Sequence, residues 1–144
     1  MKPVPGWPRI CSAVYYERGH EAIDWLCKAF GFELRLKVEG DNGNLEHSEL
    51  TYGDGVVMVA ERKERFPWAR APSQAEGINT QAMMIYVDDL EAHLKRARAA
   101  GARIVTEPQT HDYGDEYWAD RTYECVDIGG HHWWICQRLK TGKG

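Results

Sequence analysis

Two side chains that could transfer protons, His47 and Glu49, lie two positions apart in a segment expected to form a strand. Side chains at positions i and i+2 of a β-strand point to the same face of the sheet. A carboxylate there could orient the imidazole for general acid–base catalysis. The same spacing also suits a structural hydrogen-bonded pair, which we favour because structural networks often place such groups together. We therefore predict that His47 and Glu49 share a face, and we keep both as catalytic candidates.

A second pair of imidazoles, His131 and His132, invites a metal-site interpretation. Adjacent strand residues point to opposite faces, so these two rings cannot bind one ion together. His132 shares its expected face with Trp134 and Cys136. An imidazole there could bind an anion or act as a general base near neutral pH. The favoured alternative is one solvated histidine and one hydrogen-bonded wall residue.

The aromatic content is unusual for a chain of 144 residues, with six Trp, seven Tyr and three Phe. Aromatic side chains fill protein cores, but they also form stacking surfaces for flat ligands. Six Trp exceed what a small core needs, which favours a ligand site. Several of the aromatic residues cluster towards the C-terminal end of the chain: Tyr113, Tyr117, Trp118, Tyr123, Trp133 and Trp134.

Composition and charge exclude several classes of protein. The formal net charge is −4, and the basic residues are scattered, whereas nucleic-acid binding usually needs a basic stripe. No apolar run reaches the roughly 20 residues that span a bilayer. The four cysteines form no CxxC pair or zinc-module spacing, and the first ten residues lack the apolar core of a signal peptide. We therefore expect a cytoplasmic protein with reduced thiols, no membrane segment and no nucleic-acid partner.

The pattern of apolar residues predicts strand–helix–strand–strand–strand twice, an α+β fold. Helical spacing marks 19–30 and 88–100, with Gly31 and Gly101 as stops. Apolar residues alternate with charged ones over 32–38, which predicts a half-buried strand. The other expected strands are 10–16, 45–52, 56–61, 81–87, 103–106, 117–126 and 132–137. The expected parts of the chain are an N-terminal extension (1–9), a first module (10–61), a linker or lid (62–80), a second module (81–138) and a disordered tail (139–144).

Several segments resemble the vicinal oxygen chelate superfamily, which includes glyoxalase I, the bleomycin-resistance proteins and extradiol dioxygenases. The segment 22–32 resembles its first helix, and 47–54 resembles a hairpin of its PhnB-like branch. The segment 86–90 is similar to the start of its second repeat, and 113–133 to its C-terminal end. The resemblance covers roughly residues 10 to 138. It implies two βαβββ modules, a curved mixed sheet around a cavity, and frequent homodimers.

The resemblance also implies where a metal would be bound in metal-dependent members. The four ligand positions fall on Cys11, Met58, Ala82 and Trp134. A divalent ion of the family type prefers oxygen or imidazole ligands, which these residues do not supply. We therefore expect no metal and no other cofactor. Cys11 is expected to be an inert wall residue, since no activating positive charge is evident beside it.

These observations favour a small-molecule-binding protein that holds a flat or hydrophobic ligand in an aromatic-lined cavity. The alternative is a glyoxalase-like lyase or isomerase, or a dioxygenase-type enzyme, with a displaced metal site or a His/Glu acid–base pair. A domain that only associates with partner proteins is a third possibility. Either Trp134 faces the cavity and Trp133 is buried, or the reverse. The residues expected to line the ligand site are Cys11, Met58, Met84, Tyr117, Trp118, Tyr123, His132 and Trp134.

Overall fold

The computed structural model describes residues 4–143, so residues 1–3 of the expected N-terminal extension and residue 144 of the expected tail lie outside it. The chain divides after Ile78 into two compact units. The first unit contains β1 (Ser12–Tyr16), α1 (Gly19–Phe30), β2 (Glu33–Glu39), β3 (Leu45–Tyr52), β4 (Gly55–Glu61) and a short 3₁₀ helix, η1 (Pro72–Gln74). The second contains β5 (Met83–Tyr86), α2 (Leu90–Ala99), β6 (Arg103–Asp112), β7 (Ala119–Val126) and β8 (His132–Lys140).

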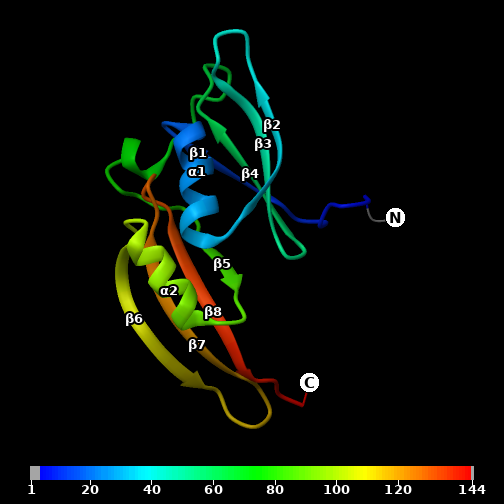
Figure 1. Cartoon of the computed structure of the whole chain (residues 1–144), viewed down its shortest axis with the longest axis vertical. Helices are drawn as coiled ribbons and strands as arrows, with labels where there is room; N and C mark the ends of the chain where they lie inside the picture. Colours follow the sequence, from blue (N-terminus) through cyan, green and yellow to red (C-terminus); the bar gives the residue numbers. More distant parts are fainter. Residues whose placement is uncertain (1–3, 144) are drawn as a thin grey trace. The chain divides into compact units, whose positions relative to one another are not determined.

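The two units have the same topology, which confirms the α+β fold with two βαβββ modules (Figure 1). The strand order is β1-β4-β3-β2 in the first sheet and β5-β8-β7-β6 in the second. In each sheet the first and last strands of the module pair in parallel, and the remaining pairs are antiparallel.

Each helix covers one face of the sheet in its own unit. In the first unit, Ile23 and Leu26 of α1 are buried together with Val14 and Tyr16 of β1. The helix ends as expected at Gly31, whose φ of 83° suits glycine and whose N–H donates to the carbonyl of Cys27. We call the other side of each sheet its helix-free face.

The second helix is fixed by its N-terminal cap. Asp89 Oδ1 accepts a hydrogen bond from the backbone N–H of Ala92 at 3.0 Å, which satisfies one of the unpaired donors of the first turn. Leu94 and Ala97 of α2 are buried, as are Trp133 and Ile135 of β8. The alternate residues of β8 therefore belong to the helix-free face.

Two strands are longer than the sequence predicts. β6 runs to Asp112, through a segment expected to be a loop, even though it contains Pro108. It is an edge strand with register shifts between Ile104 and Gln109, so the missing N–H of proline interrupts no regular ladder. β8 continues to Lys140, so residues 139 and 140 belong to the strand and not to the expected tail.

No disulfide joins the cysteines in residues 4–143. Within the same residues, neither α1 nor α2 is long and apolar enough to cross a membrane.

Candidate functional site

The helix-free face of the first sheet brings the expected residues Met58 and Glu49 together. Met58 of β4 pairs with Ala13 of β1 on one side and with Glu49 of β3 on the other. Paired residues of neighbouring strands present their side chains to the same face. Since Val14 is buried with the helix, its neighbour Ala13 lies on the helix-free face, and so do Met58 and Glu49.

Glu49 is the centre of a charged network on this face, although its own exposure is only 8%. One carboxylate oxygen, Oε2, lies 3.0 Å from His47 Nε2, and the other, Oε1, accepts from Arg35 Nε at 2.9 Å. Arg35 also donates to the carbonyl of Gly6 at 2.6 Å and lies over the ring of Trp7, 4.8 Å from its centroid. The predicted contact between His47 and Glu49 is present, and Arg35 is a third member that the sequence analysis did not identify.

Both carboxylate oxygens of Glu49 are therefore occupied. The hydrogen bond with His47, and then the contact with Arg35, lower the pKa of the Glu49 carboxyl against the opposing effect of desolvation. The group is held as a carboxylate by two partners of the same face. This geometry suits an anchoring role better than that of a free base.

Replacement of Glu49 by glutamine is expected to lower the melting temperature by several degrees at pH 7. Because the folded-state pKa is depressed, the ionised carboxylate stabilises the fold above the unfolded-state pKa of about 4.3. That contribution is lost as the pH falls through the folded-state pKa, so the wild type and Glu49→Gln should converge in acid. Melting curves from pH 7 downwards measure this. The exposed Glu33→Gln serves as the control, and a constant difference between wild type and Glu49→Gln at all pH values would contradict the account.

Cys11 lies beside the same network but is held as a thiol. Its Sγ donates to the carbonyl of Val56 at 3.1 Å. Burial raises the pKa of Cys11, and Arg35 lowers it by a smaller amount. A protonated, hydrogen-bonded thiol is a poor nucleophile.

The helix-free face of the second sheet has an equivalent arrangement. Trp134 of β8 pairs with Met84 of β5 on one side and with Glu124 of β7 on the other. Trp134 is 39% exposed and Met84 is 56% exposed, whereas Trp133 is fully buried. Of the two alternatives left open by the sequence, the structure has Trp134 on the helix-free face and Trp133 in the core.

An oriented imidazole lies next to this exposed indole. His132 Nδ1 donates to Glu124 Oε1 at 2.6 Å, and Thr106 Oγ1 contacts the other carboxylate oxygen at 3.4 Å. Within residues 4–143, Nε2 of His132 makes no hydrogen bond. The ring is therefore fixed by a carboxylate on one nitrogen and available to a ligand through the other.

Glu49 and Glu124 occupy equivalent places in the two units. Each lies on the third strand of its module and pairs with a residue of the last strand on the helix-free face. Glu49 pairs with Met58, and Glu124 pairs with Trp134. The direction of Glu124 does not follow from the sequence, because both faces of β7 carry polar and apolar residues. Alignment of the β7–β8 hairpin with the β3–β4 hairpin places Glu124 at the position of Glu49 and so gives its face.

Three expected aromatic residues do not lie beside Trp134 in the sheet. Tyr123 is fully buried on the helix side, where its hydroxyl is hydrogen-bonded to His93 Nδ1 of α2 at 2.7 Å. It neighbours Glu124 in β7 and so points to the opposite face. Tyr117 and Trp118 lie in the segment between β6 and β7 and contact each other edge to face, with ring centroids 6.2 Å apart.

The residues at the four metal positions implied by the resemblance do not fit a metal ion. They offer a thiol, a thioether, a methyl group and an indole, at Cys11, Met58, Ala82 and Trp134. Among the residues that the structure describes, no three His, Cys, Asp or Glu side chains form a group that could hold an ion.

The sequence model of the Glyoxalase/Bleomycin resistance protein/Dioxygenase superfamily matches residues 12–135, most of the chain. The chain belongs to this superfamily. It is similar to an uncharacterized protein of Mycobacterium tuberculosis, with 27% identity over 134 residues, 92% of this chain and 76% of that protein.

Solved structures of the superfamily fold agree with the topology. The crystal structure of TioX from Micromonospora sp. ML1 has 32% sequence identity and a TM-score of 0.68, covering 90% of this chain and 95% of that one. The glyoxalase/bleomycin resistance protein/dioxygenase from Alicyclobacillus acidocaldarius has 12% identity and a TM-score of 0.63, with 94% of each chain covered. The second likeness shows the fold alone.

Proposed function

We propose that this superfamily member is a small-molecule-binding protein whose ligand is flat or hydrophobic. The observation that carries the proposal is the exposed pair of Trp134 and Met84 on the helix-free face of the second sheet, beside an oriented His132. An indole offers a flat apolar surface and one N–H donor, and a methionine adapts its shape to what it contacts. Such a surface, with a few fixed polar groups, is typical of ligand sites.

The proposed contacts of the ligand differ from the sequence-based set in two respects. Tyr123 is removed from the set, because it is buried on the helix side. Trp118, 41% exposed, and Tyr117, 58% exposed, stay as flanking residues. The contacts retained are Met84, His132 and Trp134 on the second sheet. Cys11 and Met58 belong to the first unit and are not part of this face.

The chain is also proposed to have no resident metal, because the donor types at the four family positions do not suit one. We expect purified protein to contain no stoichiometric zinc, nickel or iron. Elemental analysis after purification without chelators measures this, since tight sites retain their ions. About one metal ion per chain would contradict the proposal and would favour a metal-dependent activity.

A lyase or isomerase of the glyoxalase type is the second candidate function. It is favoured by one observation, the 2.6 Å contact between Glu124 and His132, which leaves Nε2 of the imidazole available as a general base. Conversion of a bound compound by the wild type, abolished in His132→Gln but not in His47→Gln, would establish this candidate.

We further propose a C2 homodimer and membership of the PhnB-like branch, both of which the sequence resemblance implies.

The proposed function is tested by binding of flat aromatic compounds to the purified protein. Displacement or stacking at Trp134 changes the environment of its indole, so tryptophan fluorescence is a suitable first readout. Saturable binding without conversion supports a binding protein. Absence of binding by any flat or hydrophobic compound would contradict it.

A further inference from the structure

A second polar cluster lies further along β8 on the same face as Trp134. Arg138 Nε donates to Asp120 Oδ1 at 2.6 Å, and its Nη2 donates to the hydroxyl of Tyr86 at 2.6 Å. The Tyr86 hydroxyl in turn donates to Asp120 Oδ2 at 3.0 Å. These three side chains form a closed ring of hydrogen bonds, so the guanidinium is held in one orientation.

Aromatic rings further restrict the guanidinium. Its central carbon lies 5.0 Å from the centroid of the Tyr86 ring and 5.4 Å from that of Trp118. Asp120 is 8% exposed, whereas the side chain of Arg138 is 35% exposed. Asp120, Tyr86 and Trp118 therefore hold the guanidinium of Arg138 in place, and part of it remains accessible.

On its accessible edge, the guanidinium of Arg138 has N–H donors that no acceptor of the described residues engages. Asp120 engages Nε and Tyr86 engages Nη2, while Nη1 makes no hydrogen bond within residues 4–143. A guanidinium carries five N–H donors and no acceptor, so only an acceptor can complete it. The fork geometry matches a carboxylate or a similar oxyanion.

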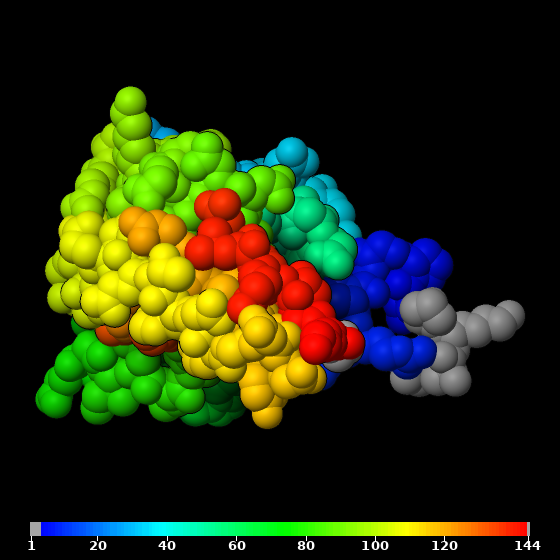
Figure 2. All heavy atoms as spheres, turned by 90° about the horizontal axis from the view of Figure 1, so that it is seen from below, coloured from blue at the N-terminus to red at the C-terminus, as the bar shows by residue number. Residues whose placement is uncertain are grey.

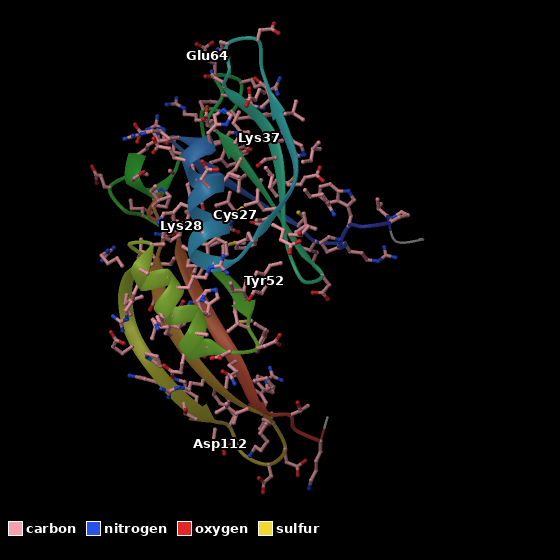
Figure 3. All side chains as sticks on the ribbon, viewed as in Figure 1. Cys27, Lys28, Lys37, Tyr52, Glu64 and Asp112 are labelled. Atoms are coloured by element: carbon pink, nitrogen blue, oxygen red, sulfur yellow. The ribbon has the colours of Figure 1, made fainter. Side chains whose placement is uncertain are left out.

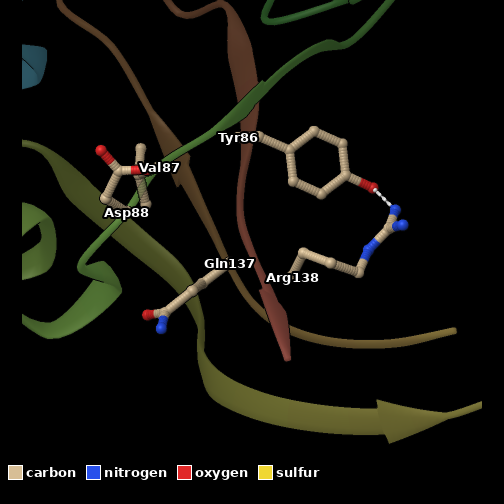
Figure 4. Close-up of a pocket in the computed structure, with 5 residues that line it drawn as sticks. All are labelled: Tyr86, Val87, Asp88, Gln137 and Arg138. Carbon is tan, nitrogen blue, oxygen red and sulfur yellow. Dashed lines mark hydrogen bonds between the residues drawn. The ribbon is translucent and has the colours of Figure 1, made fainter. Parts of the chain in front are cut away.

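Arg138 and Tyr86 line a pocket of about 410 Å³. Tyr86 and Arg138 contribute to it from one side of their strands, and Asp88 and Gln137 project from the other side (Figure 4). The amide oxygen of Gln137 is used by the backbone N–H of Leu90. Asp88 lines the same pocket as Arg138 but projects from the other side of the strands (Figure 4).

Other charges near this end of the sheet are paired with each other. The segment between β6 and β7 lies beside the end of β8 (Figure 2), where Lys140 contacts both Asp112 and Asp115 at 3.1 and 3.3 Å. Asp112 lies at the end of β6 (Figure 3). Arg138, by contrast, keeps Nη1 without an acceptor among the residues that the structure describes.

We infer that the ligand of the helix-free face carries a carboxylate or similar oxyanion that binds Arg138, while its flat body lies on Trp134. This inference rests on the proposed function and names the class of ligand. Trp134 and Arg138 are four residues apart in one strand, roughly 13 Å, so the ligand is an elongated aromatic acid. Cys136, which lies between them on the same face, is 4% exposed and accepts a hydrogen bond from Thr122 Oγ1, so no bulky exposed side chain of β8 separates Trp134 from Arg138 on this face.

The test uses two probes of nearly equal shape, biphenyl-4-carboxylate and biphenyl-4-carboxamide. The wild type should bind the carboxylate more tightly. Arg138→Gln should weaken binding of the carboxylate about tenfold or more and leave the carboxamide within roughly twofold, because one charged hydrogen-bonding partner is lost. The matched control is Arg121→Gln on β7, whose guanidinium contacts Glu91 of α2 on the other face.

Three outcomes separate this inference from the proposed function. Equal affinity of the wild type for both probes overturns the inference alone, and needs no folded variant. An equal loss in Arg138→Gln and Arg121→Gln also overturns it. Binding of neither probe overturns this inference, and the proposed function is contradicted as well only if other flat or hydrophobic compounds also fail to bind.

Discussion

Trp133→Ala is expected to lower the free energy of unfolding by about 3–5 kcal/mol, the usual cost of truncating a large buried aromatic side chain. Trp133 is fully buried against the helix side of the second sheet. Its indole Nε1 donates to Asp127 Oδ2 at 2.8 Å. The variant therefore leaves a cavity and also removes a donor from the buried carboxylate of Asp127, whose other oxygen, Oδ1, accepts from the backbone N–H groups of Gly129 and His131.

Urea or thermal unfolding of Trp133→Ala and Trp134→Ala measures this difference. Trp134 is 39% exposed, so its truncation should cost much less stability than that of its neighbour. The two substitutions have the same chemistry and adjacent positions, which makes each the control of the other. A larger loss of stability in Trp134→Ala than in Trp133→Ala would show that the faces of β8 are assigned the wrong way round.

Trp134→Ala is expected to weaken binding of a flat ligand about tenfold or more while the protein stays folded. Stacking on an indole contributes about 0.5–1.5 kcal/mol beyond the burial of area, and 1.4 kcal/mol is one decade of affinity. The apolar area lost with the ring adds to this term. Titration of wild type and variant with biphenyl-4-carboxamide isolates this effect, because the amide does not depend on the charge of Arg138.

A conservative substitution sharpens the same experiment. Trp134→Phe keeps an aromatic surface and should retain most of the affinity that Trp134→Ala loses. Met58→Ala, at the equivalent position of the first unit, tests whether the helix-free face of that unit binds the compound on its own. A folded Trp134→Ala that binds as tightly as wild type would remove Trp134 from the site.

The helices could be predicted closely, because their residues follow one clear period. Ala22, Ile23, Leu26 and Ala29 mark one face of α1, and all four are buried. Gly31 ends that helix through a positive φ that other residues rarely adopt. Local chemistry and packing agree there, so the sequence alone determines the element.

The direction of side chains in the strands was harder to predict. His132, Trp134 and Cys136 were correctly expected to share a face, since alternation follows from strand geometry. Which face of β8 packs against α2 could not be deduced, because the adjacent residues Trp133 and Trp134 place a tryptophan on each face. The long-range packing of α2 decides it.

Arg35 was missed for a related reason. The sequence alternates regularly over 32–38, which predicts that Leu34 and Leu36 share a buried face. In the structure a register shift falls between these two leucines, so Leu34 pairs with Leu50 and Leu36 pairs with Glu49. β2 is an exposed edge strand, and Arg35, at the irregularity, reaches Glu49. A bulge depends on the partner strand and leaves no clear local mark in the sequence.

The most direct test of the account follows the indole N–H resonances of the six tryptophans during titration with biphenyl-4-carboxamide. Trp133→Phe and Trp134→Phe assign the two signals that matter. We predict that the Trp134 resonance shifts saturably and that the Trp133 resonance, buried and hydrogen-bonded to Asp127, stays nearly unchanged. Saturable binding that shifts other tryptophans and leaves Trp134 unmoved would contradict a ligand site on the helix-free face of the second sheet.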